Sequence, residues 1–114
     1  MFTRAVQDRR TVSRIKAHIA CRFTFNGKNY DAYIRDISLK GAFVWSNFEP
    51  PVHAGISIKI ETSFSPRTLV LESSVVRRDC RHTERGATGA FAVTFNNRPL
   101  DLIVLINKLA ASKL

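Results

Sequence analysis

Apolar and polar residues alternate along most of the chain between residues 15 and 95. In the first run every second residue is apolar: Ile15, Ala17, Ile19, Cys21, Phe23 and Phe25. The polar residues Lys16, His18, Arg22 and Thr24 fall between them. A period of two is typical of a half-buried strand. Asn26-Gly27 follows, and this pair favours a type I′ hairpin because both central residues of that turn need a positive φ. We therefore expect an antiparallel return strand over residues 30–34.

Shorter alternating runs continue the pattern and are separated by turn-forming residues. They predict further strands over residues 42–46, 56–61, 68–78 and 89–95. Glu49-Pro50-Pro51 separates the first two of these strands, since proline has no N–H to donate to a strand ladder. The long run over 68–78 is expected to be irregular near Ser73-Ser74.

The period changes from two to that of a helix near the C-terminus. Pro99 suits a first helical turn, with Asn97 or Arg98 as its cap. The apolar stripe of this helix, about residues 99–112, comprises Leu102, Leu105, Ile106 and Leu109. Six short strands and one closing helix predict an all-β fold, an antiparallel six-stranded barrel with one C-terminal α-helix. We expect an N-terminal arm over residues 1–8 and a single domain over 9–114, with the barrel at about 15–95.

The composition adds a strong positive charge to this small domain. The chain has 114 residues and a formal net charge of +9, which favours anionic partners such as nucleotides, nucleic acid, phospholipid headgroups or acidic protein surfaces. Two cysteines are too few to indicate a disulfide scaffold, and Cys21 falls on the apolar face of its strand. The sequence has neither a long apolar span nor a signal-peptide pattern, so we expect a cytoplasmic protein that does not insert into membranes.

Two polar segments stand out from the alternating pattern. Asp36-Ile37-Ser38-Leu39-Lys40-Gly41 predicts a tight turn between strands, because Asp and Ser side chains bond nearby amides and glycine tolerates a positive φ. Upstream, Arg10 and Arg14 stand four residues apart just before the first strand, where two guanidinium groups can face one anion. Each segment alone is ordinary. Together they supply phosphate binders, a carboxylate and a hydroxyl.

This pair of motifs, in this order, resembles the PilZ domain, a bacterial receptor module for cyclic di-GMP. The resemblance implies a six-stranded barrel with the arginine pair ahead of the first strand and the D-x-S-x-x-G turn between the second and third. The sequence differs from the family's usual pattern at Ser13, where many relatives have proline, and at Ala92, where the family usually has glycine.

The resemblance also implies roles for matching residues. Arg10 and Arg14 would bind phosphate and the guanine Hoogsteen edge, and Asp36 would accept hydrogen bonds from a guanine. Ser38 would bond a phosphate oxygen or brace the turn, and Gly41 would let the backbone pass close to the ligand. Arg9 stands at a position that, in the family, influences whether one or two ligands bind, and an added cation there favours two.

We therefore expect a cyclic di-GMP receptor or adaptor whose arginine-bearing arm becomes ordered on binding and signals to an unidentified downstream protein. No further cofactor and no metal are expected, and the chain is expected to be a monomer or weak dimer. One alternative is a PilZ-like adaptor that binds proteins but not the nucleotide. Another is a basic nucleic-acid-binding barrel, which is less favoured because the aromatic residues fall on expected core faces.

Two other groupings point less clearly to chemistry. Cys80-x-His82 has metal-ligand residue types but no second pair nearby. Ser38, His18 and Asp36 could form a triad on paper, yet no glycines of a nucleophile elbow flank the serine. We expect no enzymatic activity.

Overall fold

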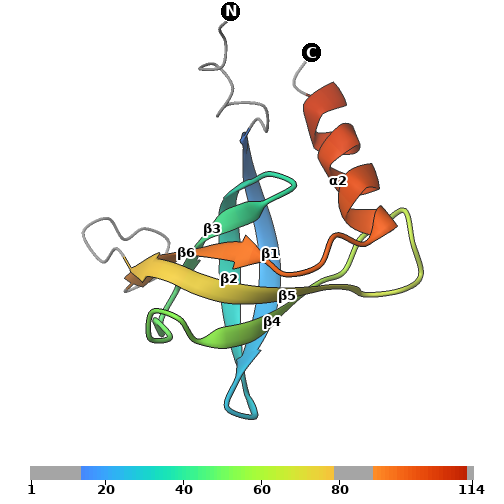
Figure 1. Ribbon diagram of the computed structural model, residues 1–114. Coiled ribbons are helices and arrows are strands. Elements are labelled where there is room, and N and C mark those ends of the chain that lie inside the picture. Colours follow the sequence, from blue (N-terminus) through green and yellow to red (C-terminus); the bar gives the residue numbers. More distant parts are fainter. Residues whose placement is uncertain (1–13, 79–88, 113–114) are drawn as a thin grey trace, which may run out of the picture.

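Six antiparallel strands close into a barrel in the computed structural model, which describes residues 14–78 and 89–112 (Figure 1). The strands are β1 (Ile15–Phe25), β2 (Lys28–Ile37), β3 (Gly41–Ser46), β4 (Gly55–Ile60), β5 (Leu69–Arg78) and β6 (Gly89–Phe95). Their order around the barrel is β1-β2-β3-β6-β5-β4. A C-terminal helix, α2 (Leu100–Ala111), follows β6. The predicted barrel with one C-terminal helix is confirmed.

The β1–β2 hairpin turns at Asn26-Gly27, as the sequence predicts. Both residues have positive φ, 52° and 78°, and Phe25 pairs with Lys28 across the turn. β2 is longer than expected: it begins at Lys28 and continues to Ile37, so only residues 38–40 connect it to β3. The hairpin therefore carries the acidic residue of the D-x-S-x-x-G motif on a strand rather than in a loop.

Alternate side chains of all six strands fill the barrel. Phe23 and Phe91 meet edge-on near its centre, with ring centroids 5.3 Å apart, an arrangement that favours aromatic pairs. Leu102 and Leu105 of α2 belong to the same core, and α2 stands beside β1 at one end of the barrel in Figure 1. None of the described helices has the length and apolar character needed to span a bilayer.

The start of α2 differs from the prediction. Pro99 itself is the extended N-cap residue, and no side chain caps the helix. Asn97 instead accepts a hydrogen bond from the Glu72 amide at 2.8 Å, and Arg98 Nε donates to the Leu39 carbonyl at 2.9 Å. The expected caps are wrong because both side chains fasten neighbouring segments of the barrel.

The irregularity of β5 also lies elsewhere than expected. Ser73 and Ser74 pair in register with β6, and the shift falls between Val75 and Arg77, which leaves Val76 as the extra residue. Ser73 is buried and bonds the Leu71 carbonyl through its hydroxyl. That local bond satisfies the serine without disturbing the ladder.

The partly buried position of Cys21 gives a prediction for thiol chemistry. Burial, with a smaller effect of the Asp31 carboxylate, raises the pKa of the Cys21 thiol from 9.0 to about 12. Between these two pH values the Cys21 thiol stays protonated in the folded chain and is ionised in the unfolded chain. The free energy of unfolding therefore falls as pH rises from about 9 towards 12. In a Cys80→Ser variant, dithionitrobenzoate at pH 8 is expected to react slowly with the folded protein and quickly in denaturant. Rapid reaction in the folded state would contradict the assigned burial.

Candidate functional site

A bulge near the end of β2 places two neighbouring charged residues on the outside of the barrel. Ile34 pairs with Val44 and Asp36 pairs with Phe43, so Arg35 is an extra residue on β2. Ile34 and Ile37 are both fully buried. The two residues between them, Arg35 and Asp36, therefore lie on the outer side. Simple alternation would have turned one of them into the core.

Basic residues of β1 and the segment before it surround Asp36. Arg14 Nη2 lies 3.3 Å from Asp36 Oδ1, with exposed side-chain fractions of 54% and 28%. Lys16 is the cross-strand partner of Asp36. Asp36 Oδ1 is closed to solvent and accepts no hydrogen bond of good geometry from the described residues, so its contact with Arg14 is an ion pair without a well-aligned hydrogen bond. The Asp36 carboxylate thus lies beside two cations and keeps an oxygen that can still accept a hydrogen bond.

Ser38 braces the turn that follows. Its Oγ accepts hydrogen bonds from the amides of Lys40 (3.1 Å) and Gly41 (3.3 Å), and its own amide donates to the Gly41 carbonyl at 2.9 Å. The residue is nearly inaccessible to solvent. Of the two roles that the sequence left open, the structure shows the bracing role.

The turn is also fastened to the rest of the barrel from outside. The Phe95 amide donates to the Lys40 carbonyl at 2.7 Å, and Arg98 Nε donates to the Leu39 carbonyl. These bonds satisfy carbonyls that would otherwise face solvent and hold the D-x-S-x-x-G segment against the end of β6. The site therefore rests on a fixed scaffold.

Gly41 is required for a reason other than the expected positive φ. It begins β3 and has no positive φ. A Cβ at this position would overlap the Val93 carbonyl of β6. Glycine thus permits β3 and β6 to approach closely. The close backbone approach at Gly41 is to β6, whereas the resemblance implied an approach to the ligand.

The outer face beside Asp36 interleaves aromatic and basic side chains. The Arg35 guanidinium lies 4.4 Å from the centroid of Trp45, and that of Arg77 lies 5.8 Å from Phe43. Trp45 is only 4% exposed, yet it lies outside the core cluster. The expected burial of aromatic residues holds for Trp45, Phe91 and Phe95, each at most 4% exposed, whereas Phe43 is only partly buried.

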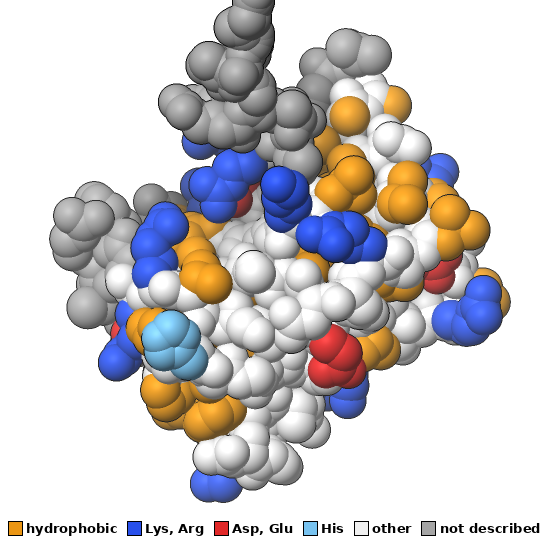
Figure 2. All heavy atoms as spheres, viewed as in Figure 1, with side chains coloured by type: hydrophobic (Ala, Val, Ile, Leu, Met, Phe, Trp, Pro, Cys, Tyr) orange, Lys and Arg blue, Asp and Glu red, His pale blue; other side chains and the backbone are white. Residues whose placement is uncertain are grey.

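Positive charge dominates this part of the surface. Figure 2 shows lysine and arginine side chains gathered along the upper part of the barrel. Four described cations lie on the outer face near Asp36: Arg14 and Lys16 beside it, Arg35 before it on β2, and Arg77 over Phe43, its partner on β3. One carboxylate among four cations leaves a strong local attraction for an anion.

The structure brings together some of the predicted site residues. Arg14, Asp36, Ser38 and Gly41 lie within one corner of the barrel formed by the ends of β1, β2 and β3. Arg9 and Arg10 lie outside the described residues. Sequence reasoning did not point to Arg35, which precedes Asp36, or to Trp45, on which the Arg35 guanidinium packs. The signal was present: strict alternation would bury Asp36, and avoiding a buried carboxylate requires a bulge at Arg35.

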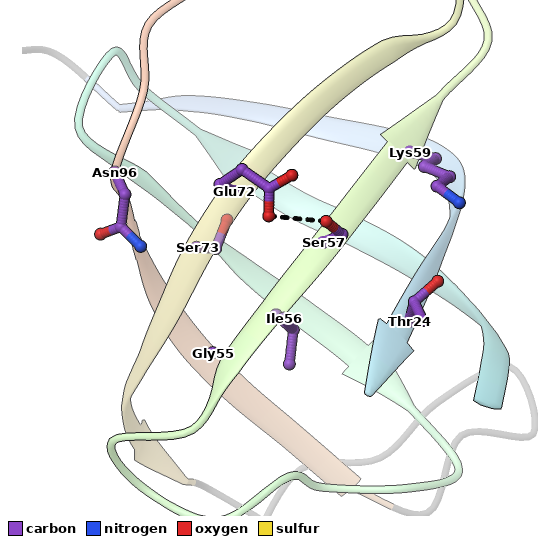
Figure 3. Close-up of a pocket in the computed structure, with 8 residues that line it drawn as sticks. All are labelled: Thr24, Gly55, Ile56, Ser57, Lys59, Glu72, Ser73 and Asn96. Carbon is purple, nitrogen blue, oxygen red and sulfur yellow. Dashed lines mark hydrogen bonds between the residues drawn. The ribbon is translucent and has the colours of Figure 1, made fainter. Parts of the chain in front are cut away.

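Two hollows on other faces of the barrel contain none of these residues. One of about 330 Å³ lies over β4 and β5 and is lined by Thr24, Gly55, Ile56, Ser57, Lys59, Glu72, Ser73 and Asn96 (Figure 3). Glu72 there accepts a 2.6 Å hydrogen bond from the Ser57 hydroxyl. The other, about 490 Å³, is lined by Ala20, Cys21, Arg22, Asp31, Lys59, Glu61 and Thr68. In both, the carboxylates counter the positive charge.

The other groupings considered from the sequence gain no support in geometry. His18 stacks on Tyr33, with centroids 4.9 Å apart, while the Ser38 hydroxyl is used within its own turn. Cys80 and His82 lie outside the described residues. Within residues 14–78 and 89–112, no three potential ligands cluster around a possible metal position.

Solved structures with a similar fold support this reading of the barrel. The PilZ domain of YcgR from Escherichia coli, solved with c-di-GMP, superimposes with a TM-score of 0.69 at 15% identity, covering 91% of this chain and 90% of that one. PlzA of Borreliella burgdorferi in complex with c-di-GMP gives 0.66 at 18% identity, covering 85% and 39%. The Bacillus subtilis motility inhibitor MotI/DgrA gives 0.69 at 12% identity, covering 99% and 52%.

The chain spans only about half or less of the last two proteins, and identities this low show a shared fold. A search of curated protein sequences finds none that matches this chain. The family comparison is more direct: the model of the PilZ domain matches residues 8–111. That range includes the arginine motif, all six strands and the whole of α2, and the chain therefore belongs to the PilZ domain family.

Proposed function

We propose that this protein is a cyclic di-GMP receptor that binds the nucleotide on the outer face of the barrel, at the corner formed by Arg14, Asp36 and the Ser38 turn. The observation that carries the proposal is the 3.3 Å contact between Arg14 and Asp36. It joins the arginine motif to the D-x-S-x-x-G motif in space, although they are about twenty residues apart in sequence. Two solved structures of similar fold contain this ligand.

The Arg14–Asp36 ion pair can be exchanged for two contacts with the ligand. A guanidinium group matches a phosphate, or guanine O6 and N7, with two parallel hydrogen bonds. A carboxylate matches the guanine N1–H and N2–H₂ donors. When Arg14 turns to the ligand, the unused acceptor of Asp36 becomes available to a base. Lysine at position 14 would lack the planar fork that this exchange needs.

Arg35 and Trp45 extend the site beside Asp36. The guanidinium plane over the indole offers a flat cationic surface on which a purine can stack. Arg35 Nε and Trp45 Nε1 are buried donors without partners among the described residues. Burying an unpaired donor is costly, so an oxygen of the bound nucleotide has free energy to gain there.

The N-terminal arm completes the proposed mechanism. Arg9 and Arg10 would add cations to the anion cradle, in keeping with two stacked ligands. Binding would order this arm against the barrel and create a surface for a downstream protein, a local electrostatic change with a wider readout. Arg10→Ala should then reduce both binding and partner recruitment.

The single tryptophan offers a direct test of the site. Trp45 lies under Arg35, which precedes Asp36 on β2, so cyclic di-GMP is expected to change its fluorescence saturably at micromolar ligand. A Trp45→Phe variant is the control: it should give no fluorescence change, while calorimetry still measures its binding of the nucleotide. Saturable binding that leaves the fluorescence unchanged would place the ligand elsewhere on the barrel.

One observation favours a second candidate, a single-stranded nucleic-acid-binding barrel. Arg35–Trp45 and Arg77–Phe43 alternate on an outer sheet face, and such faces bind bases by stacking and backbones by charge. This candidate predicts affinity that falls steeply with salt and no competition by micromolar cyclic di-GMP. A gel-shift series with the dinucleotide as competitor separates the two.

A further inference from the structure

Helix α2 carries apolar residues on two opposite faces. One face belongs to the core through Leu102 and Leu105. On the other, Leu100 is 72% exposed and Ile103 is 39% exposed. Hydrophobic side chains run along α2 at the upper right of Figure 2. A helix with one buried face ordinarily presents polar residues to solvent, so this second stripe needs a partner.

The exposed stripe follows the spacing of a helix–helix seam. It comprises Leu100, Ile103, Val104, Asn107, Ala110 and Ala111. Positions three and four apart lie on one side of a helix. Five of these six residues are apolar, and Asn107 lies near the middle. A polar residue inside such a seam fixes the register of the paired helices.

Charges at one edge of the stripe are self-complementary. Asp101 lies in the first turn of α2 and Lys108 in the last, and seven residues make nearly two full turns, so both lie along the same edge. When two such helices pair antiparallel about a two-fold axis, the same edges face each other. Asp101 of one copy then meets Lys108 of the other, twice. Among the described residues neither makes an ion pair within its own chain.

The same axis matches large side chains with small ones. Aligning Asp101 with Lys108 of the second copy places Leu100 near Ala110 and Ile103 near Asn107 of that copy. Such pairs interdigitate without leaving a void between the helices. Shape and charge thus agree on one antiparallel register.

We propose that α2 is a homodimer interface, in which the exposed stripes of two copies pack antiparallel and are aligned by reciprocal Asp101–Lys108 ion pairs. Twelve residues make a helix about 18 Å long. The contact is therefore smaller than the roughly 1,200 Å² at which standard interfaces begin. The dimer should be weak and should form in the micromolar range or above. This inference does not depend on nucleotide binding.

Sedimentation velocity over a concentration series tests the proposal with reversed charges. The wild type should shift from monomer towards dimer as concentration rises. Asp101→Lys and Lys108→Asp should each weaken association by about tenfold or more, because like charges then face each other twice. An equimolar mixture of the two variants should associate again, and so should the doubly substituted chain.

Two checks keep the outcome decisive. Lys108 Nζ also lies 5.8 Å from the Phe64 ring, so thermal unfolding of each variant is recorded to show that it is folded. Leu100→Lys, at an exposed position, should abolish dimerisation without loss of stability. A wild type that stays monomeric throughout the series overturns the proposal, as does association that the single reversals leave unchanged. If only a chain lacking residues 1–7 dimerises, the arm covers α2 and the proposal fails for the intact protein.

Discussion

Replacing Arg14 with alanine is expected to weaken cyclic di-GMP binding by about thirty-fold, or about 2 kcal/mol. The substitution removes the fork that binds phosphate and leaves Asp36 without the cation 3.3 Å away. Isothermal titration calorimetry of the two proteins at the same salt concentration measures the change directly.

Arg22→Ala is the matched control for this experiment. Arg22 lies on β1, the strand that Arg14 directly precedes, is similarly exposed, and also pairs with an aspartate, Asp31, at 3.2 Å. It lies towards the hairpin end of β1, away from the proposed site. Equal losses in the two variants would show that Arg14 acts only through the general positive charge of the chain.

Gly41→Ala is expected to destabilise the fold by about 3 kcal/mol, because the new Cβ would overlap the Val93 carbonyl and force β3 away from β6. Backbone on a neighbouring strand cannot rotate aside as a flexible side chain can. Urea unfolding followed by circular dichroism gives the free-energy difference from the transition midpoints.

Gly55→Ala provides a comparison at another strand start. Its Cβ would meet only the Ser73 carbonyl at 4.0 Å, and its φ is not positive. We expect a change of less than about 0.5 kcal/mol at this position. If Gly41→Ala were equally mild, the close approach of β3 to β6 would not be needed to hold the turn.

The sequence predicts the barrel well because its signals are local. Alternation over residues 15–25 identifies a half-buried strand, and Asn26-Gly27 identifies the hairpin that returns it. These features depend on neighbouring residues alone. Both are confirmed, as are the closing helix and the six-stranded fold.

The features that failed depend on contacts between distant residues. Asn97 and Arg98 do not cap α2, because Glu72 and Leu39 bind them from other parts of the chain. The bulge of β5 falls at Val76 because the β6 ladder stays in register up to Val75. A turn motif likewise cannot reveal that Gly41 faces Val93.

The candidate site lies between these two cases. Arg14 and Asp36 can be predicted from their motifs, and the structure shows that their side chains form an ion pair. Arg35 and Trp45 cannot be predicted in that way, because a bulge puts Arg35 on the same outer side as Asp36 and a cross-strand contact places Trp45 under Arg35. The roles of Arg9 and Arg10 stay predictions, as does the signal to a downstream protein.

The central claim is that cyclic di-GMP binds on the outer face between Arg14, Asp36 and Trp45. A titration followed by two-dimensional ¹H–¹⁵N NMR tests both binding and place in one measurement. The account predicts progressive shifts of the amides of residues 36–41 and of the Trp45 indole N–H, which gives one resolved signal because the chain has a single tryptophan. A folded protein whose spectrum does not change, or changes only around Ser57 and Glu72, would contradict it.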